Sequence, residues 1–486
     1  MCYSPVSTLI QKATFLTEHI EQEGNTMKKM LMVMLVMVLF LVFGWPVRKA
    51  AAATLVVDAN GSADFKTIQS AIDAAWDFDE ILVRPGVYKE HINYHGAMVT
   101  IKGTDPNDPN VVESTIIDGS GTGSVVMFNN AEGPYSVLRG LTIRNGQNGI
   151  ECTGADTSPL IKQCRVVSNS AAGIACSLAG PTITETIIEN NKSVGISASC
   201  GEINLCQICG NGTGKDGDAG LAGCQSIVHG CVISGNNGDG IYNHAGTVKN
   251  CLVSANLKTG FHFTNTCGCS ITNCTIVGNT ANGVWFEPQQ DCRGVKFTIT
   301  NSIVVLNGSF GVYCGSGMYL PMWELRVDWT DLWGNTNGDF GGIADKNFVD
   351  IKIGSGNLCE DPLFAKRGYW DTSRVWHEGD YHLKSKIGRW DTRTETWVQD
   401  LMDSPCLDRG DPASPLGDEP LPNGGRVNMG AYGGTAQASM SGGPKPLCTH
   451  FPEMDFDKNC KVDFGDLALF MAHWLDCNLD PQGACR

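Results

Sequence analysis

The sequence is short of charge, and of positive charge above all. Charged residues make up 18% of its 486 positions, with 35 Lys and Arg against 51 Asp and Glu, which gives a formal net charge of −16. Because 58 glycines accompany so few charges, the composition argues against a disordered chain and favours a turn-rich β protein. The shortage of basic residues disfavours nucleic acid and anionic membranes as partners. The acidic balance suits an extracellular protein that binds cations.

The sequence also lacks an apolar run long enough for a stable membrane span. Residues 30–45 are apolar, whereas a bilayer span needs roughly 20 residues. Lys28 and Lys29 precede this run, and the small residues 50–53 follow it. A basic start, an apolar centre and small residues are typical of a secretory signal peptide. We therefore expect residues 1–53 to be an N-terminal extension and signal peptide, and the mature protein to be secreted or on the cell surface.

An internal repeat carries the prediction of the fold. Seven blocks align as KQCRVVSN, TETIIENN, NLCQICGN, HGCVISGN, KNCLVSAN, TNCTIVGN and TNSIVVLN. Their third residues are Cys164, Thr186, Cys206, Cys231, Cys251, Cys274 and Ser302, and their last residues are Asn169, Asn191, Asn211, Asn236, Asn256, Asn279 and Asn307. Successive blocks lie 20 to 28 residues apart by subtraction of these positions. Strand-like blocks at this period indicate the stacked coils of a β-helix rather than helical hairpins.

The recurring Cys and Asn positions predict two ladders. Side chains alternate along a strand, so each Cys and the apolar residue two positions later point into the coil. Parallel coils about 4.8 Å apart place equivalent residues above one another, where stacked Asn amides satisfy each other at a left-handed bend. The thiols fill a narrow interior in the favoured interpretation. Export makes disulfides possible, although an odd total of 21 cysteines argues against a fully bridged framework, and a local disulfide stays open.

The segment after the signal is similar to a known family. The run DFKTIQSAIDAA, followed by ILVRPGVYKE, resembles the N-terminal cap and first coil of pectin-lyase-like β-helix proteins, which include pectinesterases and several polysaccharide lyases. The resemblance implies an all-β fold, a single-stranded right-handed parallel β-helix. The Asn-Thr-Asp, Asp-Asp and Gly-His-Gly elements of the family's enzymes are missing from the chain. The resemblance therefore implies the fold without the activity.

The rest of the chain divides by composition. We expect a cap and first coil over residues 54–98, β-helix repeats over 99–317, an irregular C-terminal capping region over 318–439, a linker over 440–447 and a compact module over 448–486. The capping region resembles the terminal segment of secreted planctomycete-type β-helix proteins. It would protect the last strand edge of the stack from association. Two of its segments share a Trp-Asp-Thr core, at Trp370 and Trp390, which suggests a small duplicated element.

The C-terminal module contains a candidate calcium loop, DFDKNCKVDFGD. Oxygen ligands stand at the positions that an EF-hand loop uses: Asp455, Asp457, Asn459, Asp463 and Asp466, with the backbone carbonyl of Lys461. With the apolar residues 467–475 as the following helix, the segment resembles one half of a dockerin repeat. Cys460 replaces the usual Gly, and the single loop puts docking to a protein partner in doubt. We expect a small α-helical, EF-hand-like module that binds Ca²⁺, and the alternative is an acidic turn before a helix.

The repeat register also predicts an aromatic stripe. After most of the aligned blocks, the sequence has a Gly followed by an apolar residue. If this apolar residue points inward, the next residue points out, and these outward residues are Tyr242, His262, Trp285 and Tyr313. Two residues further along lie His244, Thr264 and Glu287, which we place on the same face. Aromatic rings one coil apart suit stacking on sugar rings, and His244, His262 and Glu287 are the candidates for proton transfer. In the alternative interpretation, the aromatic side chains only stabilise the sheet through cross-strand contacts.

The insertion of residues 212–220 is a second candidate site. It carries Asp216 and Asp218 close together within a Gly-rich segment. Two carboxylates there could bind calcium, but a solvated Gly-rich turn is the favoured interpretation.

Two classes of function remain open from the sequence. One is a secreted carbohydrate-binding or carbohydrate-active protein, such as a lyase or hydrolase of an acidic polysaccharide. The other is a non-catalytic surface or adhesion protein, whose coil stack is a rigid spacer. Polar groups converging on the stripe would favour the first class, and a flat aromatic face without them would favour the second.

Overall fold

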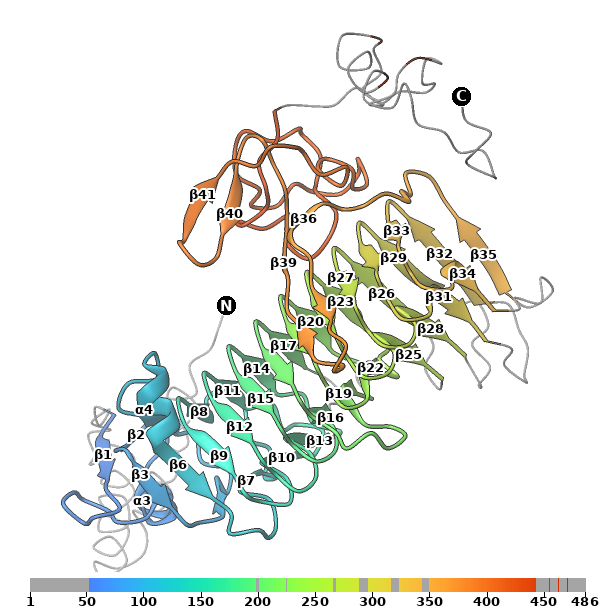
Figure 1. Cartoon of the computed structure of the whole chain (residues 1–486). Coiled ribbons are helices and arrows are strands. Elements are labelled where there is room, and N and C mark those ends of the chain that lie inside the picture. Colours follow the sequence, from blue (N-terminus) through green and yellow to red (C-terminus); the bar gives the residue numbers. More distant parts are fainter. Residues whose placement is uncertain are drawn as a thin grey trace, which may run out of the picture. The chain divides into compact units, whose positions relative to one another are not determined.

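The computed structural model describes residues 52–197, 201–223, 225–264, 268–287, 296–315, 323–342 and 349–442, together with Met454, Val462 and Phe470. The chain from β1 to β35 winds as a stack of coils, and each regular coil adds one strand to each of three parallel sheets (Figure 1). Strand order within a sheet follows every third strand of the chain, so the neighbours in space are equivalent positions of successive coils. The predicted parallel β-helix is confirmed, and in the structure it has about 11 coils.

The three sheets have 13, 11 and 11 strands. Sheet A consists of β1 (Thr54–Val57), β2 (Glu80–Val83), β5 (Thr100–Gly103), β8 (Val137–Arg139), β11 (Leu160–Lys162), β14 (Thr182–Thr184), β17 (Glu202–Asn204), β20 (Ile227–His229), β23 (Thr247–Lys249), β26 (Cys269–Thr272), β29 (Lys296–Thr300), β32 (Trp323–Asp328) and β35 (Val349–Ile353). Sheet B consists of β3 (Gly86–Tyr88), β6 (Thr115–Asp118), β9 (Thr142–Arg144), β12 (Arg165–Val167), β15 (Ile187–Glu189), β18 (Gln207–Cys209), β21 (Val232–Ser234), β24 (Leu252–Ser254), β27 (Thr275–Val277), β30 (Ile303–Val305) and β33 (Asp331–Trp333). Sheet C consists of β4 (Ile92–Asn93), β7 (Val126–Phe128), β10 (Ile150–Thr153), β13 (Ile174–Ser177), β16 (Ile196–Ser197), β19 (Ala219–Ala222), β22 (Asp239–Tyr242), β25 (Phe261–Phe263), β28 (Val284–Phe286), β31 (Phe310–Cys314) and β34 (Gly338–Gly341).

Two short helices accompany the first coils. Helix α3 (Ile68–Ala74) begins at the N-cap Thr67, whose side chain accepts from the backbone N–H of Ser70. Its buried residues, Ile68 among them, pack toward β1, β2 and β4. Helix α4 (Pro109–Ser114) lies in the connection between β5 and β6. None of the helices in the described part of the chain is long and apolar enough to span a membrane.

The predicted cysteine ladder lies inside the coils, at the start of the sheet B strands. The backbone N–H groups of Cys206 and Cys231 each donate to the Sγ of the next coil's cysteine at 3.4 Å. The N–H of Cys274 donates to Ser302 Oγ at 3.1 Å in the same way. Thr186 and Ser302 take the place of Cys in this column, because a hydroxyl and a thiol make the same kind of hydrogen bond here. Every cysteine in the described part of the chain is a free thiol, and burial raises the pKa of Cys164 to about 12.

The asparagine ladder connects Asn169 to Asn307 and continues to Asn335. Each buried amide donates to the Oδ1 of the next Asn at 2.9 to 3.1 Å. The structure corrects one detail of the prediction. The left-handed residue is the one before each ladder Asn, such as Ser168 at φ 56° and Ala255 at φ 55°. The ladder Asn itself provides the hydrogen bonds of the turn.

Residues 359–442, here the C-terminal layer, fold back along the outer face of sheet B (Figure 1). We expected a cap on the end of the stack, but the coils continue through β32 to β35 and the layer covers their side. Leu252 and Ile303 of sheet B pack against Phe364 and Leu407 of the layer. The layer contains the antiparallel pairs β36 (Phe364–Lys366) with β39 (Asp380–Leu383), β37 (Tyr369–Trp370) with β38 (Trp376–His377), and β40 (Arg389–Asp391) with β41 (Thr396–Val398).

The sequence of sheet B explains which coils the layer covers. Uncovered strands carry charged outward residues, as at Arg165 and Glu189, whereas apolar outward residues such as Leu252, Val277 and Ile303 lie under the layer. At the corner between sheets A and B, three left-handed Asn residues bind the layer. Asn250 Nδ2 donates to the carbonyl oxygens of Ala431 and Gly433, at 3.0 and 2.6 Å. In the same way, Asn273 Nδ2 donates to Asn428 O, and Asn301 Nδ2 donates to Ser414 Oγ. These amides attach the layer to three successive coils.

The duplicated Trp-Asp-Thr element forms two hairpins. In β37–β38, Trp370 pairs with Trp376, and in β40–β41, Trp390 pairs with Trp397. The first pair packs on the stack, because Trp370 Nε1 donates to Gly278 O at 2.8 Å and the Trp376 ring fills the space beside that glycine. In the second hairpin, Trp397 is 37% exposed. The same motif therefore anchors the layer in one hairpin and faces outward in the other.

Candidate functional site

The predicted stripe lies on the outer face of sheet C. Tyr242 of β22 is in register with His262 of β25, His262 with Trp285 of β28, and Trp285 with Tyr313 of β31. All four side chains are half-buried, whereas the residues that flank them along each strand, such as Phe261 and Phe263, are fully buried in the core. The period-two alternation of the strands thus brings these four residues together as expected.

The rings of the stripe are not equivalent. His262 and Trp285 stack face to face, with centroids 4.2 Å apart and planes 5° apart. Tyr242 meets His262 edge-on at 69°, and Tyr313 meets Trp285 edge-on at 79°. Tyr313 in turn stacks on Phe310 at 5.6 Å. His262, Trp285 and Tyr313 therefore each have a ring face covered by another ring. Tyr242 meets His262 edge-on, so its ring is the best placed to stack on a ligand.

A carboxylate that the sequence prediction missed belongs to this site. Asp239, at the first position of β22, is 3% exposed, and its Oδ2 lies 3.0 Å from His262 Nδ1. Its Oδ1 accepts from the backbone N–H of Thr259 at 2.8 Å. The pair orients the imidazole, while His262 Nε2 and Trp285 Nε1 are enclosed without a described partner. Asp239 lies three residues before Tyr242 in the segment NNGDGIY. This proximity in the sequence was the one sign that Asp239 belongs to the site.

Uncharged polar groups form the edge of the site beside Tyr242. The phenol oxygen of Tyr242 lies 3.3 Å from Thr264 Oγ1. Asn243 donates through Nδ2 to Thr264 Oγ1 at 2.9 Å and accepts from the Thr264 N–H at 2.6 Å. This cluster presents hydroxyl and amide groups next to an aromatic ring. Such a combination suits a ligand that has both an apolar face and hydroxyl groups.

The structure places His244 elsewhere than we expected. Asn243 has φ 52°, so the chain bends after β22 and the alternation of faces ends there. His244 is fully buried inside the coil, where desolvation lowers its pKa to about 4 and keeps it neutral. Glu287 continues the strand instead: its N–H donates to Phe263 O at 2.8 Å, and its side chain lies half-buried beside Gly315. Of the three predicted proton-transfer candidates, His262 and Glu287 remain near the stripe and His244 does not.

The insertion of residues 212–220 forms a closed turn. Asp218 is 5% exposed, and its Oδ2 accepts from the N–H groups of Thr213 and Lys215 at 2.6 and 3.1 Å. Asp216 lies 3.0 Å from Lys258 Nζ. The two carboxylates thus have separate partners, as the interpretation of a Gly-rich turn expects.

The predicted calcium ligands Asp455, Asp457, Asn459, Lys461, Asp463 and Asp466 lie outside the described residues, as does the predicted signal peptide. Within the described ranges, no three His, Cys, Asp or Glu side chains gather as a metal site would require.

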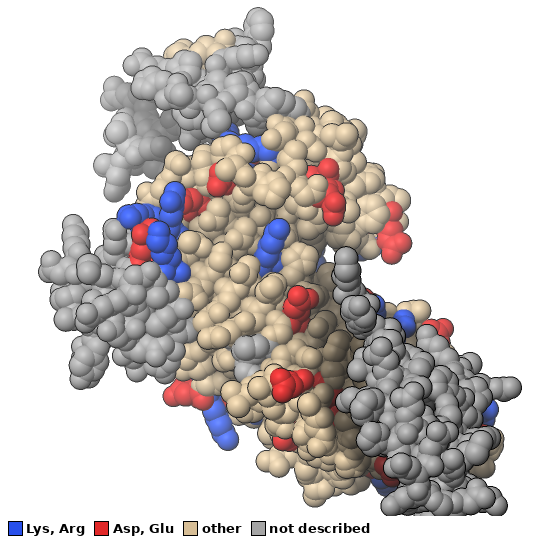
Figure 2. Space-filling model, turned by 180° about the vertical axis from the view of Figure 1, so that it is seen from behind, with Lys and Arg blue, Asp and Glu red and all other residues tan. Residues whose placement is uncertain are grey.

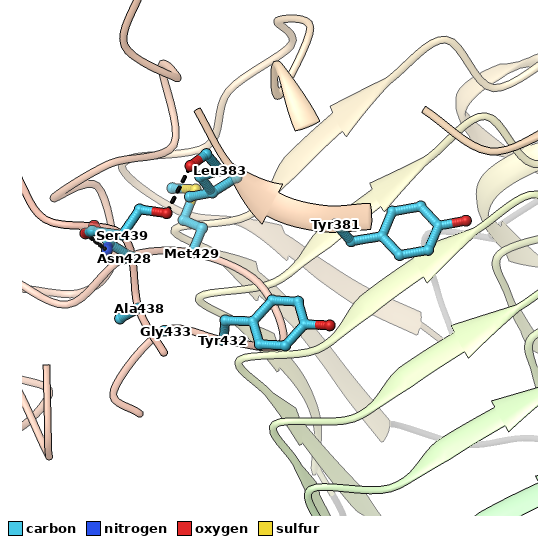
Figure 3. Close-up of a pocket in the computed structure, with 8 residues that line it drawn as sticks. All are labelled: Tyr381, Leu383, Asn428, Met429, Tyr432, Gly433, Ala438 and Ser439. Atoms are coloured by element: carbon cyan, nitrogen blue, oxygen red, sulfur yellow. Dashed lines mark hydrogen bonds between the residues drawn. The ribbon is translucent and has the colours of Figure 1, made fainter. Parts of the chain in front are cut away.

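A pocket in the C-terminal layer lies between β39 and residues 428–439 (Figure 3). The rings of Tyr381 and Tyr432 extend from its two sides in the same direction, and burial raises the pKa of both phenols. Ser439 Oγ donates to Leu383 O at 2.6 Å, which ties the two sides together. No lining residue is charged. The pocket is therefore part of the packing of the layer and lies apart from the stripe.

Several solved structures are similar to this chain. The A-module of the Azotobacter vinelandii mannuronan C-5 epimerase AlgE4 matches at 16% identity with a TM-score of 0.45, over 60% of this chain and 92% of that one. Pectate lyase Pel9A matches at 15% and 0.48, over 78% and 97%. The catalytic unit of the GH87 α-1,3-glucanase of Streptomyces thermodiastaticus matches at 12% and 0.35, over 65% and 70%. No curated protein matches the sequence.

Two family models match parts of the sequence. The model of the right-handed β-helix region matches residues 211–320, which include the whole stripe. The coil stack is a right-handed parallel β-helix. A second model, described as disaggregatase related, matches residues 334–410, which cover the end of the β-helix and the start of the C-terminal layer.

Proposed function

We propose that this protein is a carbohydrate-binding β-helix, and that a glycan lies along the outer face of sheet C at the stripe. The observation that carries the proposal is the register of Tyr242, His262, Trp285 and Tyr313 on four successive coils, with hydroxyl and amide groups beside Tyr242. Equivalent residues of parallel coils repeat at about 4.8 Å, so the face is a periodic surface that suits a periodic polymer.

The chemistry of the site favours binding over catalysis. The ring of Tyr242 can stack on the apolar face of a sugar, while the half-buried Asn243 amide, which Thr264 holds in place, can exchange hydrogen bonds with its hydroxyls. A general base must reach the proton that it removes. His262 Nε2 is enclosed and His244 lies in the core, so neither meets that requirement, and Glu287 is left without a second predicted proton-transfer group beside it. We therefore propose no reaction for this face.

The second candidate function is a non-catalytic surface or adhesion protein with a rigid coil stack. The stacking of His262 on Trp285 favours it, because two rings that share their faces stabilise neighbouring strands without any ligand. In that case, the stripe would strengthen the β-helix, and its removal would lower stability without affecting glycan binding.

Affinity electrophoresis in gels that contain soluble polysaccharides separates the two functions. We expect retarded migration of the wild type and about tenfold weaker retardation of the Tyr242→Ala variant, since the loss of one aromatic stack is worth about 1.4 kcal/mol. Tyr369→Ala is the matched control, because Tyr369 is 54% exposed and lies in the C-terminal layer. Equal migration of all three proteins in every gel would contradict the proposal and favour the structural role.

We also propose that the protein is exported through the signal within residues 1–53 and that its C-terminal loop binds Ca²⁺. Support comes from the basic and apolar order of the N-terminal segment and from the spacing of oxygen ligands from Asp455 to Asp466. Calorimetric titration of the full chain with calcium should show one site, and the Asp455→Ala variant should lose it. An unchanged titration would contradict the assignment. The module is also the proposed attachment point for a protein partner.

A further inference from the structure

We infer that the stripe selects an uncharged glycan rather than an acidic polysaccharide. This inference rests on the proposed function and narrows it, because the sequence alone pointed to an acidic ligand. A polyuronate requires cations that are free to pair with its carboxylates. Two observations support an uncharged ligand. They are the charges at and around the stripe, and the residues along the path that a polymer would follow.

The charged groups at the stripe are acidic. Asp239 lies behind His262 and holds its Nδ1, and Glu287 stands two residues beyond Trp285. Among the described residues, the cation that precedes the stripe strand β25 is Lys258. Its ammonium is already bound to Asp216 Oδ1 and to Lys215 O, each at 3.0 Å. Among the described residues of this face, a uronate would meet the carboxylate of Glu287 and no ammonium or guanidinium that lacks an ion-pair partner.

The column of sheet C that contains the stripe carries no Lys, Arg, Asp or Glu from Ala175 to Gly341, and Glu151, in register with Ala175, precedes it. Ala175 is in register with Ser197, Ser197 with Ala222, and Ala222 with Tyr242. These three small residues are half-buried and leave a low floor in line with the Tyr242 ring. At the far end, Tyr313 is in register with Gly341. Between Ala175 and Gly341, a chain that extends from the stripe thus meets small or aromatic residues, and the next residue of the column before Ala175 is acidic.

Cations on the other two faces of the β-helix are largely neutralised within the molecule. On sheet A, Lys102 pairs with Glu80, Lys162 with Glu185, Lys296 and Lys352 with Glu324, and Arg326 with Asp328; on sheet B, Arg144 pairs with Asp118 and Arg165 with Glu189. Figure 2 shows the charged side chains of one face in small separate groups among uncharged residues. With a net charge of −16, the long-range field repels a polyanion.

The test is affinity electrophoresis of the full chain with neutral and acidic polymers in parallel gels. The neutral gels contain xylan, galactomannan or a soluble β-glucan, and the acidic gels contain polygalacturonate or alginate, all in chelator and about 0.15 M salt, which screens weak surface attraction. We expect retardation in at least one neutral gel, loss of that retardation in Tyr242→Ala, and free migration in both acidic gels.

A charge change sharpens the test. Glu287→Lys places a cation beside the stripe and should produce a measurable retardation by polygalacturonate, in which the wild type migrates freely. Glu202→Lys, on the exposed outer face of sheet A, makes the same charge change away from the stripe and should leave migration as in the wild type. Retardation of the wild type in an acidic gel, with loss in Tyr242→Ala, would overturn this inference and keep the proposed function. Free migration in every gel would overturn the proposed function itself.

Discussion

Replacement of Asn256 with alanine tests whether the asparagine ladder holds the coils together. Asn256 is fully buried, and its Oδ1 accepts from the backbone N–H and the amide of Asn236, at 3.1 and 2.9 Å. Its own amide donates to Ile233 O at 3.1 Å and to Asn279 Oδ1 at 2.9 Å. The substitution leaves the Asn236 N–H without an acceptor and removes one partner from each of the other three groups.

The expected loss of stability follows from the free-energy cost of buried polar groups that lack a hydrogen-bond partner. A buried donor or acceptor without a partner costs about 1–3 kcal/mol. One orphaned N–H and three weakened groups therefore lower the free energy of unfolding by about 3–5 kcal/mol, which is a large part of the roughly 5–15 kcal/mol of an ordinary domain. Because each coil of a solenoid contacts only its neighbours, the loss should be local to the coils of β21, β24 and β27.

Urea denaturation followed by circular dichroism measures the total loss, and amide hydrogen exchange locates it. We expect a lower midpoint and faster exchange in residues 231–280 than in the earlier coils. Asn129→Ala is the control, because Asn129 is exposed and its amide contacts are on the surface, so the expected change is within about 0.5 kcal/mol. A midpoint and an exchange pattern of Asn256→Ala that match the control would refute the role of the ladder.

Three further predictions concern the core and the C-terminal layer. Burial raises the pKa of Asp331 from 3.8 to about 7, so the wild type should lose stability as pH rises from about 4 to 7. Asp331→Asn should reduce that loss by on the order of 2–4 kcal/mol in urea titrations at the two pH values, and parallel curves would contradict the burial argument. Cys251→Ser should keep the ladder bonds and stay within about 1.5 kcal/mol of the wild type, whereas Cys251→Val should fall below it in the same assay; the reverse order would exclude the hydrogen-bond role. Trp376→Ala should lower the melting temperature of the layer by calorimetry, with Trp397→Ala as the exposed control, and equal effects would disprove the anchor at Gly278.

The sequence alone was sufficient to predict the structural features that repeat from coil to coil. The Cys and Asn positions recur once per coil, so their alignment predicts the stack, both ladders and the register of Tyr242 to Tyr313 without any tertiary information. Each of these features depends only on equivalent positions in neighbouring coils. Once the period is known, the contacts follow from strand geometry.

Other features depend on single residues or distant segments. His244 is inside because Asn243 adopts a left-handed conformation, and an Asn in that position carries no such signal by itself. Asp239 reaches His262 on the next coil, from a position that the strand alternation does not connect to it. The C-terminal layer packs on sheet B through contacts such as Asn250 to Ala431, which are 181 residues apart in the sequence. A segment without periodicity gives no register from which to predict such docking.

The row formed by Asn250, Asn273 and Asn301 has a consequence for how the length of this molecule can change during evolution. Each of these Asn side chains makes a hydrogen bond with the backbone of residues 411–433. The spacing of the three coils must therefore match the spacing of these partners in the C-terminal layer. A duplicated coil between β24 and β30 would shift one anchor by a whole step and detach it. A duplication between β9 and β18 would lengthen the molecule without moving any anchor. We expect relatives of different length to gain and lose coils in that first half.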